Sequence, residues 1–244
     1  MRVLLLGGTE GARELAALLA AQGIDATLSL ASLSLAGLSL AGVTEAAHNP
    51  LPQRSGGFGG VAGLCAYIRA QSITHIIDAT HPFAAQMSRH AAAASAKTGV
   101  RLLRLTRPDW ALRPHWQAVA SLADAAAALP KGARVFLTVG SQSLAAFQAR
   151  DLWCLTRSIQ PPATHLLGEV VLARPPFTLA GEVALMRQHA ITHLVCKNAG
   201  GNQTAAKLDA ADQLGIKVVI ITRPVLAPAP EWATPETLLG ALLQ

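Results

Sequence analysis

The sequence predicts an α/β protein built from two Rossmann-like domains with parallel sheets, which are related by an internal repeat and face a ligand cleft between them. Three observations support this prediction. Of the 244 residues 51% are apolar and only 14% are charged, as expected for sheets that helices cover on both faces. Strand-like and helix-like runs alternate along most of the chain. Segments of the first half also recur in the second half.

The first half can be divided into successive strand and helix units. Residues 2–6 (RVLLL) form a strand-like run, and residues 9–23 have apolar positions at helical spacing before a glycine that caps a helix end. The run THIIDA at 74–79 indicates a buried strand. An alanine-rich helix is expected at 81–99, with a proline in its first turn and a glycine after its end. Residues 100–108 (VRLLRLTRP) then predict another strand.

The second half repeats this order. ITHII at residue 73 matches ITHLV at residue 191, an offset of 118. GVRLLRLTRP at residue 99 matches GIKVVIITRP at residue 215, an offset of 116, so the helix between the two segments has nearly the same length in both halves. The opening RVLLLGGTEGARELA also resembles RVFLTVGSQSLAAF in the second half. The alternative is a chance similarity between two parallel sheets, whose strands look alike.

The repeat places one domain at residues 1–108 and a second at 109–244, with the boundary uncertain within 108–130. An insert at 28–42, LSLASLSLAGLSLAG, consists of three copies of a five-residue unit, which fits the period of neither a strand nor a helix. Its first copy continues the second strand, and the others are expected to form a Ser/Gly loop. Whether the closing strand of each half joins its own sheet or the other one stays open.

The composition narrows the class of partner. Twenty Lys and Arg residues against fourteen Asp and Glu give a net charge of +6, which favours a phosphate-bearing cofactor or a polycarboxylate substrate. With 4% aromatic residues and no basic run, we expect no nucleic acid partner. Cys65, Cys154 and Cys196 lack disulfide or metal spacing, and no histidines show metal spacing, so we expect no metal. The absence of a signal peptide and of an apolar run of ~20 residues predicts a cytoplasmic protein without a membrane partner, with a monomer as the working expectation.

The glycine turn LLLGGTEGAR at residues 4–13 is the first stretch that suggests chemistry. Backbone amides at a helix start point at phosphate, and glycine lets a pyrophosphate approach closely. The candidate cofactor contacts are Gly7, Gly8, Thr9 and Glu10. The spacing differs from the usual G-x-G-x-x-G, so a ligand-free turn is the alternative. Because Ser29 lies where an NAD site usually has an acid, and Arg13 is nearby in sequence, the turn favours NADP over NAD.

A second glycine-rich stretch, RSGGFGGVAGL at residues 54–64, surrounds an aromatic residue. Glycines on both sides of an aromatic ring let the backbone approach a flat ligand, and Arg54 is able to hold a negative group. We therefore expect Gly57, Phe58 and Gly59 to contact the cofactor. The alternative is a mobile loop whose phenylalanine packs into the core.

Polar residues follow the two repeated strands that begin with ITH. Asp78, Thr80 and His81 follow the first strand, and Lys197 and Asn198 end the second. Ligands bind at the carboxyl ends of parallel strands, so these residues are expected at a site. We take Asp78, His81 and Lys197 as candidate proton donors, Thr80 as a cofactor contact and Asn198 as a substrate contact. For Asp78 and His81, a structural role at the helix start is the alternative.

Two arginines each precede a proline at the end of matching strands, Arg107 in the first half and Arg223 in the second. If the two halves face one another, these arginines converge with Arg157, Lys197 and Lys207 on a cleft that attracts carboxylates. Solvated surface charge is the alternative for any one of these residues.

Seven segments then occur in a fixed order across nearly the whole chain: GGT with a following Arg, SGGFGGVAGLCAYI, IIDATHPFAAQMS, GVRLLRLTRPDW, RVFLTVGSQ, ARPPF and CKNAGG with AAKLDAA. Together they resemble the precorrin-6A reductase family of cobalamin biosynthesis. The resemblance implies an NADPH-dependent reduction that saturates the bond between carbons 18 and 19 of precorrin-6A, a polycarboxylate tetrapyrrole, and gives precorrin-6B. Here SLAG occurs twice and Val43 follows, where the family usually has one copy and a basic residue, so the contacts of the 2′-phosphate stay open.

Two other classes of function stay open. A methyltransferase acting on a similar macrocycle would also use glycine-rich turns in an α/β fold, but it would bind S-adenosylmethionine. A non-catalytic two-lobed ligand-binding protein would share the cleft and consume no NADPH. The sequence also leaves open whether the substrate carries cobalt.

Overall fold

The computed structural model describes residues 1–31 and 49–244. The chain divides into two compact units, each with one six-stranded sheet. Unit 1 consists of Met1–Arg107 and Val225–Gln244, and unit 2 consists of Pro108–Pro224. Every strand pair described in the two sheets is parallel. The predicted α/β class with two parallel sheets is confirmed.

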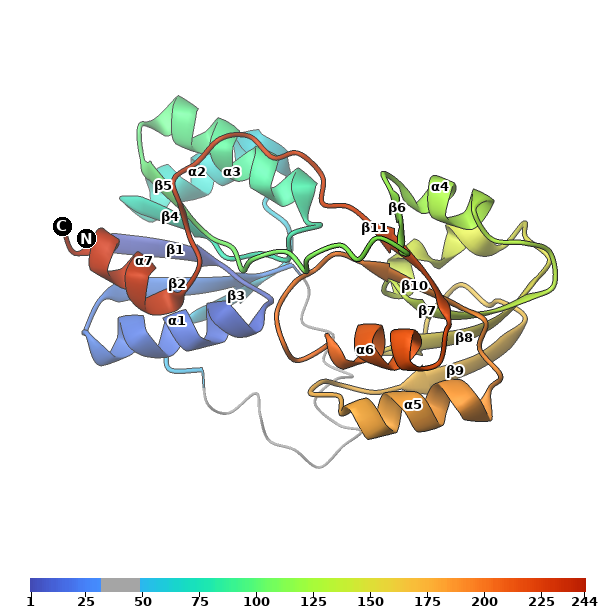
Figure 1. Cartoon of the computed structure of the whole chain (residues 1–244). Helices are drawn as coiled ribbons and strands as arrows, with labels where there is room; N and C mark the ends of the chain where they lie inside the picture. The colour runs from blue at the N-terminus through green and yellow to red at the C-terminus, as the bar shows by residue number, and fades with distance from the viewer. Residues whose placement is uncertain (32–48) are drawn as a thin grey trace. The chain divides into compact units, whose positions relative to one another are not determined.

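Unit 1 is a sheet with helices on both faces (Figure 1). Its elements are β1 (Arg2–Leu6), α1 (Glu10–Ala21), β2 (Asp25–Leu30), β3 (Gln53–Ser55), α2 (Gly60–Ala70), β4 (His75–Asp78), α3 (Ala85–Thr98), β5 (Arg101–Leu105), β12 (Glu231–Trp232) and α7 (Pro235–Leu242). The strand order is β3-β2-β1-β4-β5-β12. Helices α1 and α7 pack on one face, and α2 and α3 pack on the other.

The apolar pattern explains these two layers. In β1, Val3 and Leu5 point into the core with α1 and α7, whereas Leu4 and Leu6 point into the core with α2 and α3. Successive side chains of a strand alternate between faces, so a continuous apolar run is what a sheet covered on both sides requires. In α1, the buried positions from Ala12 to Leu19 recur at helical spacing and form one packed stripe.

Unit 2 has the same layered plan. Its elements are β6 (Gln117–Val119), α4 (Leu122–Ala127), β7 (Ala133–Thr138), the 3₁₀-helix η3 (Ser141–Phe147), β8 (Leu152–Ser158), β9 (Gly168–Leu172), α5 (Leu179–Gln188), β10 (His193–Lys197), α6 (Ala206–Gln213) and β11 (Lys217–Ile221). The strand order is β9-β8-β7-β10-β11-β6. Strands β7, β10 and β11 occupy the places that β1, β4 and β5 hold in unit 1, so the repeat seen in the sequence is a structural repeat.

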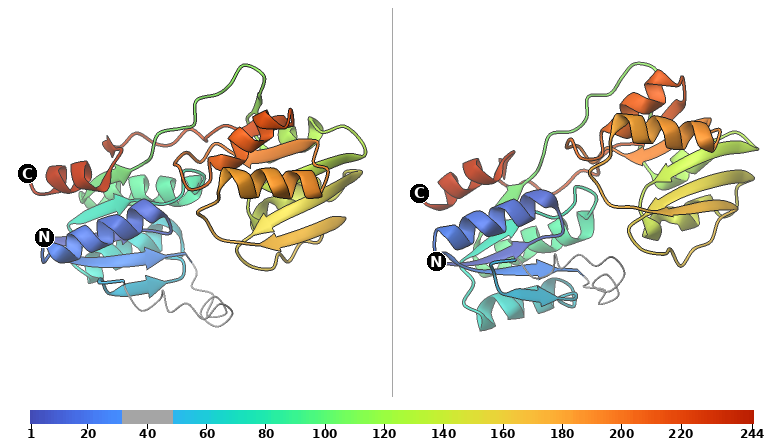
Figure 2. Two further views of the ribbon diagram at one scale, coloured as in Figure 1. Left: turned by 60° about the horizontal axis from the view of Figure 1, so that its bottom comes forward. Right: turned by 90° about the horizontal axis from the view of Figure 1, so that it is seen from below.

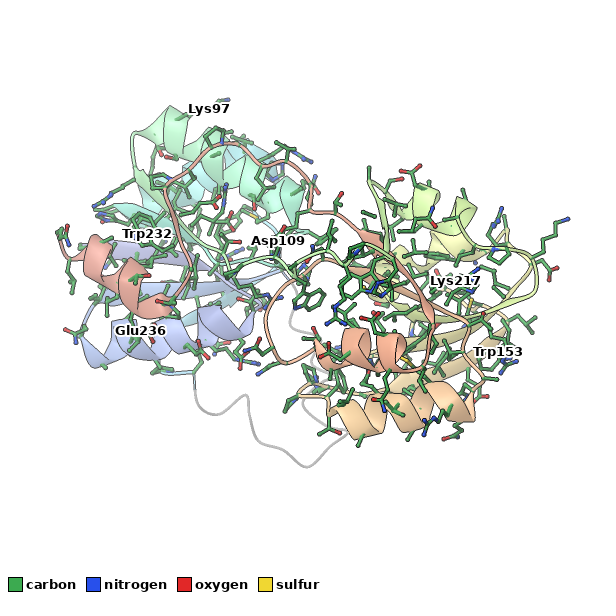
Figure 3. The ribbon with its side chains drawn as sticks, in the orientation of Figure 1. Lys97, Asp109, Trp153, Lys217, Trp232 and Glu236 are labelled. Atoms are coloured by element: carbon green, nitrogen blue, oxygen red, sulfur yellow. The ribbon has the colours of Figure 1, made fainter. Side chains whose placement is uncertain are left out.

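The sixth strand of each sheet comes from the other repeat. Strand β6 follows β5 along the chain but pairs with β11, and β12 follows β11 but pairs with β5. The strands that close the two repeats, β5 and β11, therefore stay in their own sheets, and the short strands after them are exchanged. Figure 3 labels Trp232 and Glu236 in the segment that returns to unit 1.

This exchange changes the predicted domain limits. The first crossing between the units lies between Arg107 and Pro108, at the start of the predicted boundary range. The predicted second domain, 109–244, differs from unit 2 at its C-terminal end, because residues 225–244 contribute β12 and α7 to unit 1. Figure 2 shows both ends of the chain in unit 1.

Of the insert predicted at 28–42, residues 28–30 belong to β2, as expected for its first copy, and residues 32–42 lie outside the described part of the chain. Among the residues that the structure describes, no helix is long and apolar enough to cross a membrane. The same residues contain no group of three His, Cys, Asp or Glu side chains placed to hold a metal ion.

Candidate functional site

The glycine turn connects β1 to α1 at the carboxyl edge of the unit 1 sheet. The backbone N–H of Gly7 donates to the carbonyl of Ser29 at the end of β2 (2.9 Å). The Thr9 hydroxyl caps α1 by accepting from a backbone amide in its first turn (3.1 Å), and it donates to the carbonyl of Ala79 after β4 (2.8 Å). The turn is thus bonded to the two neighbouring strand ends, and the first turn of α1 begins at this edge of the sheet.

The turn has a geometry suited to phosphate without the usual spacing. If Gly7 takes the first position of G-x-G-x-x-G, Thr9 and Ala12 take the second and third. Ala12 is buried, as close packing of helix and strand requires. Gly8 has a φ of +114°, which disfavours any L side chain, and nothing lies within 4 Å of the position of a Cβ atom there. The space beside Gly8 is open to a ligand.

A second feature lies one strand further out, at the ends of β2 and β3. The Arg54 guanidinium lies 3.9 Å from the ring centroid of Phe58 and 5.3 Å from that of Tyr67. Its Nη1 donates to Ser29 Oγ (2.8 Å) and its Nη2 to the Gly57 carbonyl (3.2 Å). We call these five residues the Arg54 cluster. Phe58 is half-buried and also packs on the core beneath α2 and α3.

The loop that carries Phe58 requires glycine at several positions. Gly56, Gly59 and Gly60 all have positive φ angles, between +77° and +95°. A Cβ atom on Gly63 would lie 1.6 Å from the Phe58 carbonyl oxygen, so the first turns of α2 pack directly on the loop backbone. Nothing lies within 4 Å of the position of a Cβ atom on Gly57. The close contact between Gly63 of α2 and the Phe58 backbone therefore fixes the position of the loop.

The tip of β4 is a buried ion-pair network. Asp78 is 2% exposed; its Oδ1 accepts from the Thr80 amide (3.3 Å) and hydroxyl (2.7 Å), and its Oδ2 pairs with Arg104 Nε (3.3 Å). Arg104 also pairs with Glu231 Oε1 (2.7 Å) and donates to the Ala227 carbonyl (3.1 Å). Both oxygens of Asp78 have partners, which supports the structural alternative for this residue. Arg104 was missed by the sequence reasoning, although an arginine inside the apolar run LLRLT was a signal.

The other two candidate proton donors differ from Asp78. His81 is exposed, and its Nδ1 accepts from the Phe83 amide (3.2 Å). Lys197 ends β10 in unit 2, and its Nζ donates to Ser143 Oγ (2.9 Å). Burial lowers the pKa of Lys197 from its ordinary value. A lowered pKa makes its ammonium group a better acid near neutral pH.

Arg157 is buried, and its charge is paired with a carboxylate. It is 8% exposed, and its guanidinium makes two hydrogen bonds to the buried carboxylate of Glu182 (2.5 and 3.0 Å). The same group lies 3.7 Å from the ring centroid of Phe177 and 4.8 Å from that of Phe136. These contacts indicate that Arg157 joins β8 to α5.

Three more of the candidate substrate contacts fasten unit 2 together. Asn198 accepts from the Trp110 amide (2.9 Å) and donates to its carbonyl (3.1 Å), and Lys207 Nζ lies 4.6 Å from the Trp110 ring centroid. Arg223 donates to the Asn198 carbonyl (3.0 Å) and pairs with Asp109 (2.6 Å), which Figure 3 labels. These bonds connect residues near the start of unit 2 to residues in its last third. Arg107 is half-buried just before the first crossing.

The predicted cofactor contacts, in contrast, cluster in unit 1. The strand ends, the turn after β1 and the loop before α2 bring the following residues to the carboxyl edge of one sheet: Gly7, Gly8, Thr9, Ser29, Gly57, Phe58, Gly59 and Thr80. Glu10 opens α1, and Arg13 is exposed on the same helix. A parallel sheet of order 3-2-1-4-5-6 with a glycine turn after its first strand is the dinucleotide-binding arrangement. Fold and site thus define a two-unit α/β protein of the Rossmann class.

Comparison with known proteins gives the family. The profile of the family described as "Precorrin-6x reductase CbiJ/CobK" matches residues 2–242, so the chain belongs to this family. A protein of Rhodococcus erythropolis named precorrin-6A reductase is 48% identical over 248 residues, which cover 99% of this chain and 96% of the relative. A solved structure described as CobK precorrin-6A reductase is 45% identical, with a TM-score of 0.89, over 100% of this chain and 96% of that one. A protein of Priestia megaterium named cobalt-precorrin-6A reductase is 26% identical, over 99% of this chain and 98% of the relative.

Proposed function

We propose that this protein is an NADPH-dependent oxidoreductase that acts on precorrin-6A in cobalamin biosynthesis. It saturates the double bond between carbons 18 and 19 of the macrocycle and gives precorrin-6B, a reduction of the CH–CH class. Family membership supports the substrate, and the higher identity to a precorrin-6A reductase than to a cobalt-precorrin-6A reductase favours the metal-free macrocycle.

The observation that carries the cofactor assignment is the carboxyl edge of the unit 1 sheet. The glycine turn offers the open position at Gly8 and the amides of α1, which suit a pyrophosphate. The adjacent strand ends carry Ser29 and Arg54, and residues 29–31 and 53–57 contain no Asp or Glu. An acid at this place selects NAD through the ribose hydroxyls, whereas arginine accommodates the extra phosphate of NADP. The residues present therefore fit NADPH.

When bound, NADPH supplies the hydride. Hydride transfer depends mainly on geometry, so the chain has to orient the macrocycle against the nicotinamide. It also has to supply one proton. We propose that His81 or Lys197 gives that proton, because both oxygens of Asp78 are engaged inside the fold. For the substrate carboxylates we propose Arg107, which is half-buried just after the carboxyl end of β5.

A pair of substitutions tests the glycine turn. Gly8→Asp and Gly8→Ala carry the same backbone strain at a φ of +114°, but only aspartate brings a negative charge. Two unit charges about 4 Å apart near a protein surface repel by about 4 kcal/mol, so we expect NADPH to bind the aspartate variant at least tenfold more weakly than the alanine variant. Titration of each variant with NADPH measures this difference. Equal affinities would refute the placement of the pyrophosphate.

The reaction itself is tested by anaerobic incubation with precorrin-6A and NADPH. We expect the absorbance of the macrocycle to change, and deuterium from NADPH labelled at its nicotinamide carbon 4 to appear at carbon 19 of the product. Thermal melting with S-adenosylmethionine serves as the control for a methyltransferase and should show no stabilisation. An unchanged macrocycle spectrum would overturn the proposed function.

A further inference from the structure

The Arg54 cluster lies at a fixed distance from the glycine turn. In the sheet register, Leu6 is the partner of Ser29, and Ser29 is the partner of Arg54. Arg54 is therefore two strand spacings, or about 10 Å, from the end of β1. In a Rossmann fold the pyrophosphate lies at the turn after the first strand, and the adenine ribose extends towards the end of the second strand. Arg54 thus lies beside the place of the ribose.

Arg54 differs in its partners from three other enclosed arginines; the half-buried Arg134 also has uncharged partners, the Trp153 ring and the His189 carbonyl, but it lies at the amino end of β7. Arg104, Arg157 and Arg223 each have a carboxylate partner, namely Asp78 with Glu231, Glu182 and Asp109. Within the described part of the chain, no carboxylate lies within salt-bridge distance of Arg54. Its partners are two aromatic rings, a hydroxyl and a carbonyl, none of which is charged. A half-buried cation with no anion among the described residues suits an anionic ligand.

The guanidinium is also held in place before any ligand arrives. Phe58 lies against one face, and the bonds to Ser29 and Gly57 use two of the five N–H donors. A planar fork with the remaining donors matches the oxygen atoms of a phosphate monoester. Because Ser29 Oγ accepts from Arg54, its own hydroxyl hydrogen is available for a second bond to the same phosphate.

We propose that Arg54, assisted by Ser29, binds the 2′-phosphate of NADPH and so selects NADPH over NADH. This inference rests on the proposed NADPH dependence. It assigns discrimination between the two cofactors to the Arg54 cluster, whereas the glycine turn binds the part that both cofactors share.

The test compares Arg54→Gln with Arg69→Gln, which removes the same charge from an exposed position on α2. Affinities for NADPH, NADH, 2′,5′-ADP and 5′-ADP are measured by calorimetry without substrate. A charge-assisted contact of this kind is expected to change affinity about 10- to 100-fold. We expect Arg54→Gln to lose that factor for NADPH and 2′,5′-ADP, and to bind NADH and 5′-ADP as the wild type does. Arg69→Gln should match the wild type throughout.

Three outcomes decide the question. If Arg54→Gln keeps the wild-type preference for NADPH, the inference is wrong, while the proposed function stands. If it weakens all four ligands equally, Arg54 has a structural role only, and the inference again fails. If the wild type itself binds no NADPH, the proposed function fails, and this inference fails with it. Should Arg54→Gln not fold, Arg54→Lys keeps the charge without the fork, and an intermediate loss confined to the two 2′-phosphorylated ligands is expected.

Discussion

Arg104 is expected to contribute more to stability than any other charged residue of unit 1, and Arg104→Met tests this. Methionine retains an apolar chain of similar length but removes both ion pairs and the bond to the Ala227 carbonyl. The Asp78 side chain is 2% exposed, so the variant leaves a buried carboxylate without a cation. Breaking such a pair costs about 3–5 kcal/mol, a large share of the ~5–15 kcal/mol by which proteins of this kind are stable.

Two further variants separate the contributions of the two ion pairs of Arg104 to stability. Glu231→Gln should cost only ~0–1 kcal/mol, because water solvates the 48% exposed Glu231 side chain and Arg104 keeps its pair with Asp78. The double variant Asp78→Asn with Arg104→Met should recover part of the loss, since it removes the unpaired buried charge. Urea unfolding followed by circular dichroism gives all three free energies of unfolding.

Hydrogen exchange locates the effect. The amides of residue 104 and Thr106 donate to the carbonyls of Pro230 and Trp232 (both 2.9 Å), so they report directly on the pairing of β5 with β12. We expect both amides to exchange faster in Arg104→Met than in the wild type. A loss below ~1 kcal/mol, or unchanged exchange at these two amides, would refute the reasoning.

Two other predictions concern the site. Gly63→Ala should destabilise the protein by about 2 kcal/mol or more and weaken NADPH binding, because its Cβ would lie 1.6 Å from the Phe58 carbonyl oxygen. Gly57→Ala, where the space is open, is the matched control, and similar melting curves for both variants would count against this prediction. Burial lowers the pKa of Lys197 below its ordinary value of 10.5. Between the folded and the unfolded pKa, the unfolded chain therefore binds a proton that the folded chain has released, and the free energy of unfolding rises with pH. Urea titrations at several alkaline pH values should show that Lys197→Met lacks this rise; parallel profiles would contradict it.

The fold could be predicted from the sequence wherever a strand is long and apolar. The two ITH segments and the two TRP segments became β4, β10, β5 and β11 in matching places, because buried parallel strands leave continuous apolar runs. The exchanged strands could not be predicted. Strand β12 has two residues and β6 has three, which is too short for any periodicity, and tertiary packing alone decides which sheet each one joins.

For the candidate site, the position of a residue in the fold could be predicted from the sequence, whereas the partners of its side chain could not. The glycine turn and Ser29 lie where a Rossmann fold needs them, because chain order fixes which strand ends are neighbours. Whether a charged residue is engaged depends on partners distant in sequence. Arg157 bonds to Glu182 and Arg54 bonds to Ser29, and in each pair the residues are 25 positions apart. The carboxylate of Glu182 neutralises its arginine, whereas the hydroxyl of Ser29 does not. No local pattern distinguishes these two outcomes.

The exchange of closing strands also bears on the order of events during synthesis. Unit 2 is one continuous stretch that contains all six strands of its sheet, and the Arg223–Asp109 pair holds its two ends together. Unit 1 needs residues from both ends of the chain. As the chain leaves the ribosome, N-terminal domains usually fold first. Here the first 107 residues emerge early but await β12, near the very end, so the later-made unit is the first able to complete its sheet.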